Sequence, residues 1–198
     1  APRARSFTGL TKSLGDFVPR LPWYGAVAMC VDDAEARALI PMLTRRVITY
    51  GTDEAADYRA SNIRVDGKSW HFDVDRGANK PALRVRLGVP GQHNVMNALA
   101  AIAIATDEGI ADDAIVQGLG EFAGVDRRFE ISASIDVSES VVTLVDDYGH
   151  HPTEVEAVIA TARQIWPERR LVMVYQPHRF SRTNDLFDDF VRVLSTVD

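Results

Sequence analysis

The sequence has a single cysteine, so it cannot form an internal disulfide. It has no apolar run of the ~18–20 residues that cross a bilayer, and its first residues show no apolar segment typical of a secretory signal. Basic residues are outnumbered: 22 Lys and Arg against 28 Asp and Glu leave a formal net charge of −6. Because such a surface repels phosphates, a nucleic-acid partner is disfavoured. We therefore expect a cytoplasmic protein without membrane or nucleic-acid partners.

The composition that remains is that of an ordinary globular protein. Of 198 residues, 46% are hydrophobic and 25% charged, which suits one large domain or two small ones. Cys30 lies in the apolar run 27–31, where a buried core thiol is expected rather than a nucleophile. The chain starts without Met and stops just after a helical pattern, so we expect it to be part of a longer protein.

The first third of the chain predicts a strand–helix–strand unit. Gly25–Val31 is a continuous apolar run typical of a buried strand, and Arg46–Gly51 is a β-branched run that ends at a glycine. Between them, apolar positions from 36 to 43 have helical spacing after Asp32 and Asp33, either of which can cap the helix. Two strands joined by a helix are expected to pair in parallel.

An antiparallel meander is predicted beside this parallel pair. Tyr58–Val65, Ser69–Val74 and Leu83–Leu87 alternate polar and apolar residues, which is typical of strands with one wet face. His71 falls inside one of them and is interpreted as a packing or surface histidine. Two helices are predicted to follow, Asn94–Glu108 and Asp112–Phe122.

The last third repeats strand and helix after a polar segment at 124–130, which is the candidate domain boundary. Such alternation is the repeating unit of a doubly wound α/β domain. The expected order is a buried strand at Val141–Val145, a helix at Pro152–Ile165 opened by its proline, a second buried strand at Leu171–Tyr175 and a helix at Asn184–Leu194.

Polar loops follow both strands of this last segment. In an open parallel sheet, ligands bind beyond the carboxyl ends of the strands, where loops lead into helices. Asp146–Pro152 follows the first strand and Gln176–Thr183 follows the second. Four of the five histidines lie in such loops or at a helix start, which favours a site there: His93, His150, His151 and His178.

Two kinds of ligand suit these loops. Aspartates and histidines can bind zinc or manganese, but the neighbouring His150 and His151 cannot easily turn both rings to one ion, and no HExxH motif or cysteine pair is present. Arg179 and Arg182 favour an anion, because guanidinium groups bind carboxylate or phosphate through paired hydrogen bonds. They can also be solvated surface charges. We predict no metal centre made by the protein alone.

A third candidate site opens the alanine-rich helix, in the segment GQHNVMN at 91–97. Asn94 and Asn97 are three residues apart and share a helical face. Their amides can read the edge of a purine or cap the helix, and spacing alone favours capping. No GxxxxGK[ST] loop and no GxGxxG fingerprint is present, which argues against a dehydrogenase and against nucleotide binding by those motifs.

Four segments resemble the Mur ligases: GQHNVMNALAAIAIA, GVDRRFE, VDDYGHHPTEVEAVIATAR and VYQPHRFSRTNDLFDDF. The resemblance runs from about Phe17 to the end of the chain. It implies an α/β fold in which residues 1–127 are the end of a P-loop-type central domain with an antiparallel meander. Residues 128–198 would then be the start of a Rossmann-like C-terminal domain that binds the amino acid. The P-loop of the family is not among these residues.

The resemblance also implies ATP-dependent amide synthesis, with Mg²⁺ neutralising phosphate charge. Within the family, DDYGHHPTEV together with QPHRFSRT favours the branch that joins L-alanine to the carboxylate of UDP-N-acetylmuramate through an acyl phosphate. Two alternatives stay open: a related murein-peptide ligase, and an inactive binding fragment that lacks the P-loop.

The site residues implied by the resemblance fall into two groups. One group would hold ATP: His93, Asn94 and Asn97 at the adenine, Arg128 at the phosphates and Asp147 at the ribose. The other would face the amino acid and the acyl phosphate: Tyr148, His150, His178, Arg179 and Arg182, of which His178, Arg179 and Arg182 are the expected catalytic residues.

Overall fold

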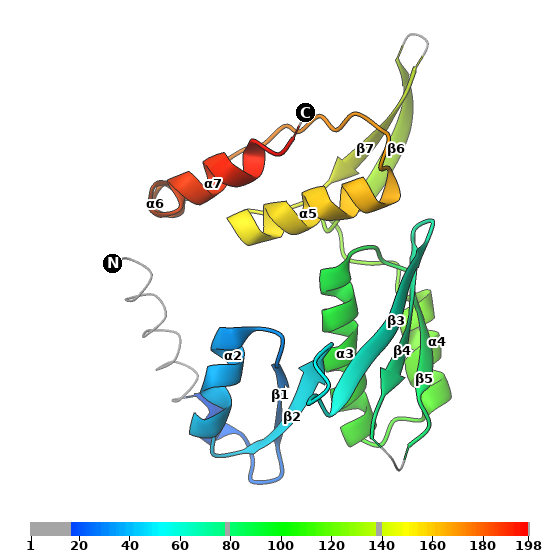
Figure 1. The fold of residues 1–198 in the computed structure, drawn as a ribbon, viewed down its shortest axis with the longest axis vertical. Helices are drawn as coiled ribbons and strands as arrows, with labels where there is room; N and C mark the ends of the chain where they lie inside the picture. Colours follow the sequence, from blue (N-terminus) through cyan, green and yellow to red (C-terminus); the bar gives the residue numbers. More distant parts are fainter. Residues whose placement is uncertain (1–16, 78–79, 138–139, 198) are drawn as a thin grey trace.

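The computed structural model describes residues 17–77, 80–137 and 140–197. They form two lobes, one above the other in Figure 1. The first lobe contains a five-stranded sheet of order β1-β2-β3-β4-β5, and the second contains a two-stranded sheet of β6 and β7 with three helices. No helix in these ranges is long and apolar enough to cross a bilayer.

The predicted strand–helix–strand unit is confirmed. β1 (Ala26–Cys30) and β2 (Arg46–Gly51) pair in parallel, from Ala26 beside Arg46 to Cys30 beside Tyr50. A short 3₁₀ turn, η1 (Val18–Arg20), precedes β1. Between the strands, α2 (Ala34–Leu39) continues into a second 3₁₀ turn, η2 (Ile40–Met42). The carboxylate of Asp33 caps α2 by accepting the N–H of Ala36 at 2.7 Å. Cys30 is half-buried rather than buried, because β1 is the edge strand of the described sheet.

The meander is confirmed as well. β3 (Tyr58–Asp66) lies beside β2, and β4 (Ser69–Asp75) and β5 (Leu83–Leu87) follow in antiparallel pairing. Alternate residues of β4 and β5 are buried, so one face of these strands enters the core and the other faces solvent. A bulge interrupts the pairing of β3 with β4 between Ser61 and Arg64.

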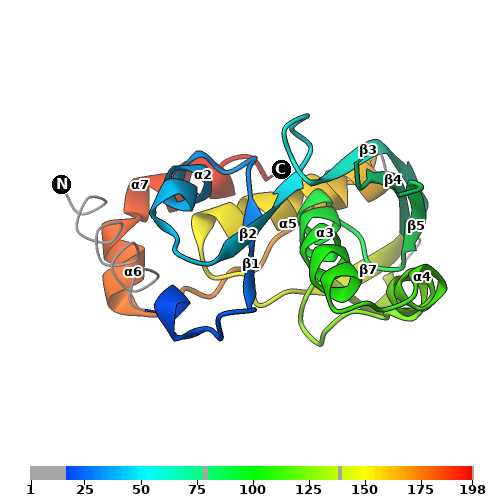
Figure 2. The same cartoon turned by 90° about the horizontal axis from the view of Figure 1, so that it is seen from below.

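Two helices cover the buried face of this sheet (Figure 2). They are α3 (Gln92–Asp107) and α4 (Asp112–Glu121). Leu99 and Ile102 of α3 are fully buried in one cluster with Phe72 and Leu87 from the strands. This packing fixes the N-terminal end of α3 at the side of the lobe that faces the second lobe.

The second lobe starts with a hairpin and continues with helices. β6 (Glu130–Val137) and β7 (Ser140–Asp146) are antiparallel, and α5 (Pro152–Ile165) follows with Pro152 in its first turn, as predicted. The predicted helix Asn184–Leu194 was wrong in its start and its continuity. Helix α6 (Phe180–Asp185) begins four residues earlier, and α7 (Phe187–Leu194) follows after a break at Leu186.

Both strands expected to be buried in this lobe differ from the prediction. Val141–Val145 lies within β7, but Val141 and Leu144 are half-exposed because β7 pairs only with β6 among the described strands. Leu171–Tyr175 forms no strand. Leu171, Met173 and Tyr175 pack on the core of the lobe, whereas Val172 and Val174 are 70% and 98% exposed. A buried strand needs neighbours on both faces, and the described residues cover only one face of this segment.

Candidate active site

The segment between the lobes is tied to the loop after β7. Phe129 is buried, stacks on Trp166 with ring centroids 6.2 Å apart, and donates its N–H to Oδ2 of Asp147 at 2.8 Å. The other carboxylate oxygen of Asp147 accepts the N–H of Gly149 at 2.6 Å. Arg127 and Phe129 have φ values of 58° and 52°, in the left-handed region that non-glycine residues rarely adopt. These bonds hold Arg128 between two constrained neighbours.

Glu154 anchors the start of α5. Its Oε2 accepts the N–H groups of His150 at 2.9 Å and His151 at 3.1 Å, while Nδ1 of His151 accepts the N–H of Thr153 at 3.3 Å. Burial raises the pKa of Glu154, but the hydrogen bond from His150, the nearby charges and the bond from His151 outweigh burial, and the net pKa is lowered. A guanidinium nitrogen of Arg128 lies 3.8 Å from this carboxylate.

Three aromatic rings bring the two polar loops of the second lobe together. The ring centroids of Tyr148 and His150 are 5.2 Å apart, and His178 lies 6.2 Å from His150 and 6.4 Å from Tyr148. Arg127 stacks over the Tyr148 ring at 4.9 Å, at cation–π distance. The loops at 146–151 and 176–179 therefore share one edge of the lobe.

Two polar atoms of this lobe are buried without a hydrogen-bond partner among the described residues: Oη of Tyr175 and Nη1 of Arg182. Burial raises the pKa of Tyr175, and the positive charge of Arg182 acts against that shift. A buried guanidinium nitrogen without an acceptor is costly and therefore suits a bound anion. Arg179, by contrast, is exposed, and its φ is 68° at the start of α6.

The N-terminal end of α3 meets the second lobe at Gly91. The φ of Gly91 is 107°, and a Cβ there would lie 2.5 Å from Cε1 of His93 and 3.1 Å from Oγ1 of Thr161 in α5. Partial desolvation of the His93 imidazole lowers its pKa; the carboxylate of Asp147 acts against this shift and the guanidinium of Arg128 adds to it. The pKa of His93 therefore depends on a carboxylate and a guanidinium from the other side of the boundary between the lobes.

Asn94 and Asn97 lie on one face of α3, as their spacing predicted. The amide of Asn94 donates to the carbonyl of Pro90 at 2.6 Å, and Asn97 donates to Oδ1 of Asn94 at 3.2 Å. Neither side chain caps the helix by accepting a backbone N–H, because Gly91 holds the N-cap position without a side-chain bond. The interpretation of these amides as helix caps was therefore wrong.

The structure brings together some of the residues named from the sequence and leaves others apart. The charges of Arg128 and Asp147 act on the pKa of His93, and Tyr148, His150 and His178 form the ring cluster. Among the residues that the structure describes, no hydrogen bond, ion pair or ring contact joins Arg179, Arg182 or the α3 amides to that cluster. In the parts of the chain that the structure describes, no three His, Cys, Asp or Glu side chains converge as metal ligands.

Sequence reasoning missed several residues that build this site. Glu154 could have been found, because an acidic residue three positions after a helix-capping residue signals a capping box. Phe129 carries no such signal, since its role is a backbone N–H. Tyr175 was assigned only to a strand. No sequence pattern around Arg127 indicates its left-handed backbone.

Comparison with known proteins finds a matching family domain for each lobe. Residues 6–105 match the Mur ligase middle domain and residues 127–198 match the Mur ligase glutamate ligase domain. Among solved structures, the UDP-N-acetylmuramate–alanine ligase MurC of Thermotoga maritima is similar at 26% identity, with a TM-score of 0.65 over 83% of this chain and 40% of that one.

Two more distant structures share the fold. MurF from Acinetobacter baumannii is 22% identical with a TM-score of 0.64, over 82% of this chain and 33% of its own. Folylpolyglutamate synthetase from Lactobacillus casei is 14% identical with a TM-score of 0.62, over 92% of this chain and 45% of its own. The chain thus spans less than half the length of each of these three proteins. Because the middle-domain match alone covers half of the sequence, and a C-terminal domain match follows it, the chain belongs to the Mur ligase family.

Proposed function

We propose that this chain is part of a cytoplasmic, ATP-dependent ligase of peptidoglycan precursor synthesis that joins L-alanine to the carboxylate of UDP-N-acetylmuramate. The observation that carries the proposal is the convergence of the two polar loops, which place His150, His178 and Tyr148 at one edge of the lobe. The MurC of Thermotoga maritima, whose name states this substrate pair, is similar over 83% of the chain. We place the boundary between the two domains at 127/128.

ATP would lie between the lobes. Asn94 and Asn97 would contact the adenine with His93, Arg128 would reach the phosphates and Asp147 would hold the ribose. The residues suit this ligand. Each oxygen of the Asp147 carboxylate accepts one backbone N–H and keeps a lone pair for a ribose hydroxyl. Asn97 is exposed and bonds only to Asn94 among the described residues, so its carbonyl oxygen is available to a base.

The amino acid and the activated carboxylate would lie at the ring cluster. Bound ATP supplies the phosphoryl group that turns the muramyl carboxylate into an acyl phosphate. Arg182, whose buried Nη1 has no hydrogen-bond partner in the described ranges, and Arg179 would hold the L-alanine carboxylate and the negative charge that develops as the amine attacks. His178 would orient the substrates from beside His150. Closure of the second lobe would exclude the water that hydrolyses an acyl phosphate.

Mg²⁺ is part of the proposal as an ion held by the nucleotide phosphates. The described residues offer no cluster of three metal-binding side chains, so we assign the ion to no residue of this chain.

A ligase acting on another amino acid or on a murein peptide is the second candidate. It is favoured by the fold that this chain shares with MurF, at a TM-score of 0.64. A small pocket for alanine discriminates by size, and a missing methyl group changes binding by only ~1–3 kcal/mol. We therefore expect glycine to be a weak competitor of L-alanine.

The first test is titration of the chain with ATP and Mg²⁺, followed by amide-resolved NMR. We expect weak binding with shifts at 91–97, 128 and 146–150, and the reduction of these shifts by Asn97→Asp but not by Asn184→Asp. Shifts absent from these segments would refute the nucleotide site.

The second test uses a ligase of full family length that carries this segment. Arg179→Ala is expected to reduce L-alanine ligation far more than it weakens ATP binding. Unchanged turnover with L-alanine would show that the assigned role is wrong, and faster turnover with another amino acid or a murein peptide would favour the second candidate.

A further inference from the structure

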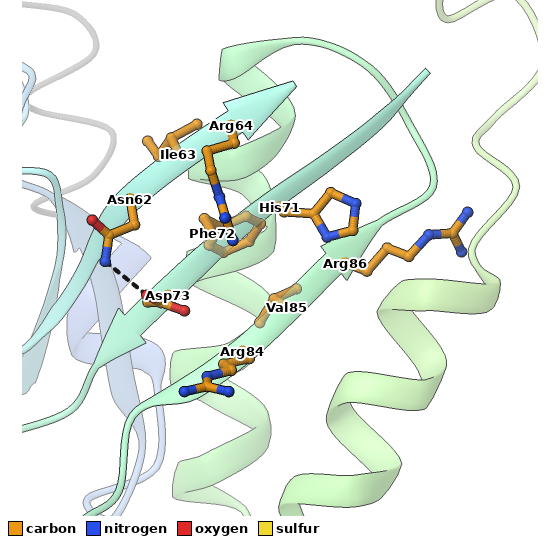
Figure 3. Close-up of a pocket in the computed structure, with 9 residues that line it drawn as sticks. All are labelled: Asn62, Ile63, Arg64, His71, Phe72, Asp73, Arg84, Val85 and Arg86. Carbon is orange, nitrogen blue, oxygen red and sulfur yellow. Dashed lines mark hydrogen bonds between the residues drawn. The ribbon is translucent and has the colours of Figure 1, made fainter. Parts of the chain in front are cut away.

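The outer face of the β3–β4–β5 meander carries a row of cationic side chains that the proposed ligase site does not use. The strand register sets Arg64 beside His71 and His71 beside Arg86, so the three residues cross the sheet in one line (Figure 3). On the opposite face, the residues that alternate with them, such as Phe72 and Val85, are buried under α3 and α4. The row therefore faces away from the core.

Few acidic groups neutralise this row. Arg64 and Arg86 form no ion pair among the described residues, and Arg86 donates only to Oγ of Ser69 at 3.0 Å. The charged neighbours on this face are Arg84 and Asp73, which are directly opposite each other, Arg59 and Asp75, which are also paired, and Asp66 and Lys68 at the end of the hairpin. The carboxylate of Asp73 also accepts the amide of Asn62 at 2.8 Å. Among the residues that line the hollow, three arginines stand against one aspartate, a local excess of positive charge in a chain of net charge −6.

The bulge in β3 shapes a hollow around the row. Asn62 has a φ of 52°, and the register between β3 and β4 shifts there between Ser61 and Arg64. Such bulges bend a strand and turn its side chains, and they are frequent beside binding sites. The hollow has a volume of about 610 Å³ and is lined by Arg64, His71, Arg84 and Arg86, a size within the range of small-molecule sites.

We propose that this hollow binds a short oligophosphate, such as a free tripolyphosphate or the phosphate chain of a nucleotide. Guanidinium groups pair with phosphoryl oxygens through two hydrogen bonds. Arg64 and Arg86 are two strand spacings apart, ~10 Å at the backbone, so their side chains can hold successive phosphoryl groups of one chain above His71. Because the row presents cations rather than apolar side chains, charge supplies most of the recognition.

The test is titration of the 198-residue chain with sodium tripolyphosphate, without metal, at ~0.01 M ionic strength. At this ionic strength the Debye length is ~30 Å, so screening between nearby charges is weak. Amide-resolved NMR is needed, because the arginines of the ligase site also attract phosphate. We expect saturable shifts at 62–73 and 84–86. The double variant Arg64→Gln with Arg86→Gln should weaken binding at these amides at least tenfold. Arg20→Gln, which changes an exposed arginine elsewhere, should not.

Further variants and ligands in the same titration identify which phosphate compound binds. Arg64→Lys with Arg86→Lys keeps the charge and should still weaken binding several-fold, since a lysine cannot form the paired bonds. Equal affinity for ATP and tripolyphosphate at these amides points to a free oligophosphate, and tighter ATP binding points to a nucleotide. Equally tight binding of citrate, or shifts that persist in the double glutamine variant, would overturn the proposal. Thermal unfolding of each variant checks that the fold is retained. Because the amides at 62–73 and 84–86 lie outside the proposed ligase site, a failure of the ligase test would not change the result of this one.

Discussion

The carboxylate of Asp147 accepts the backbone N–H of Phe129 at 2.8 Å, which joins the loop after β7 to the segment between the lobes. Arg128 precedes Phe129, so two residues proposed to contact ATP are connected through a single hydrogen bond. The same carboxylate also accepts the N–H of Gly149. Asp147 is therefore both a candidate ligand group and part of the local framework.

Asp147→Asn is expected to lower the free energy of unfolding by ~1–3 kcal/mol, because the new amide nitrogen would face a backbone N–H and leave one donor unsatisfied. Urea unfolding followed by circular dichroism measures the loss. Asp146→Asn is the control, since Asp146 is exposed and its ion pair with Arg127 spans 3.4 Å. Equal losses in the two variants would contradict the structural role of Asp147.

The lowered pKa of His93 predicts a pH-dependent stability. The unfolded chain binds a proton at this histidine near pH 6.5, whereas the folded chain binds it only at lower pH. The free energy of unfolding should thus rise with pH between the lowered pKa and about 6.5, and stay level above. His93→Gln should flatten this slope in denaturation curves measured across the range.

The charges around His93 provide an internal check. Arg128→Gln should raise the pKa of His93 and Asp147→Asn should lower it, as followed by NMR titration of the imidazole. His71→Gln on the far face of the sheet should leave the His93 titration unchanged. A shift of the same sign in the first two variants would be inconsistent with the geometry.

Gly91→Ala should disrupt the contact between the lobes. A methyl group there would meet His93 at 2.5 Å and Thr161 at 3.1 Å, at a backbone φ of 107°. Gly109→Ala is a matched control, because its φ is 76° and its added Cβ meets no atom within 4 Å. We expect about 1 kcal/mol of destabilisation for Gly109→Ala from the backbone alone. Gly91→Ala should cost a further ~1–3 kcal/mol from overpacking, measured by thermal unfolding; a smaller effect than that of Gly109→Ala would argue against the contact.

Glu154→Gln should destabilise the second lobe by ~1 kcal/mol, the usual effect of losing a helix cap. The pKa of Glu154 is lowered overall in the folded chain, so the stabilisation by its charge is present at neutral pH and is lost as the pH falls through that lowered value. The difference between wild type and variant should shrink accordingly in acid. Glu156→Gln, whose ion pair with Arg192 is exposed, should cost less than ~0.5 kcal/mol.

Arg182→Ala should lower kcat for amide formation by ~10²–10³ in a full-length ligase that carries this segment, the usual effect of removing a group that stabilises developing charge. The KM for ATP should change little. Arg192→Ala, on the neighbouring helix α7, is the control. An unchanged kcat would remove Arg182 from the proposed site.

Much of the fold followed from local patterns. Arg46–Gly51, Leu83–Leu87 and Pro152–Ile165 have the predicted bounds, because a glycine, alternating burial and a helix-opening proline mark them in the sequence. Leu171–Tyr175 failed for a non-local reason. A continuous apolar run predicts a buried extended segment, but a strand needs a partner, and no described strand pairs with this one.

The site was predicted as a set of residue types and not as a geometry. Loop position indicated that His150 and His178 would be neighbours, since both loops leave the same lobe edge. The orientation of Asp147 depends on the backbone N–H of a residue 18 positions away, which no side-chain pattern reports. The exposed state of Arg179 and the buried nitrogen of Arg182 likewise depend on how α6 packs.

The left-handed backbones of Arg127 and Phe129 bear on motion of the whole molecule. The carbonyl of Arg127 accepts the N–H of Tyr148 at 2.7 Å and the N–H of Phe129 bonds to Asp147, so Arg128 is fixed to the second lobe and moves with it in any rotation between the lobes. A ligand that binds this guanidinium and the first lobe together would favour one interlobe angle, and a crosslink that fixes this angle would raise the affinity for that ligand.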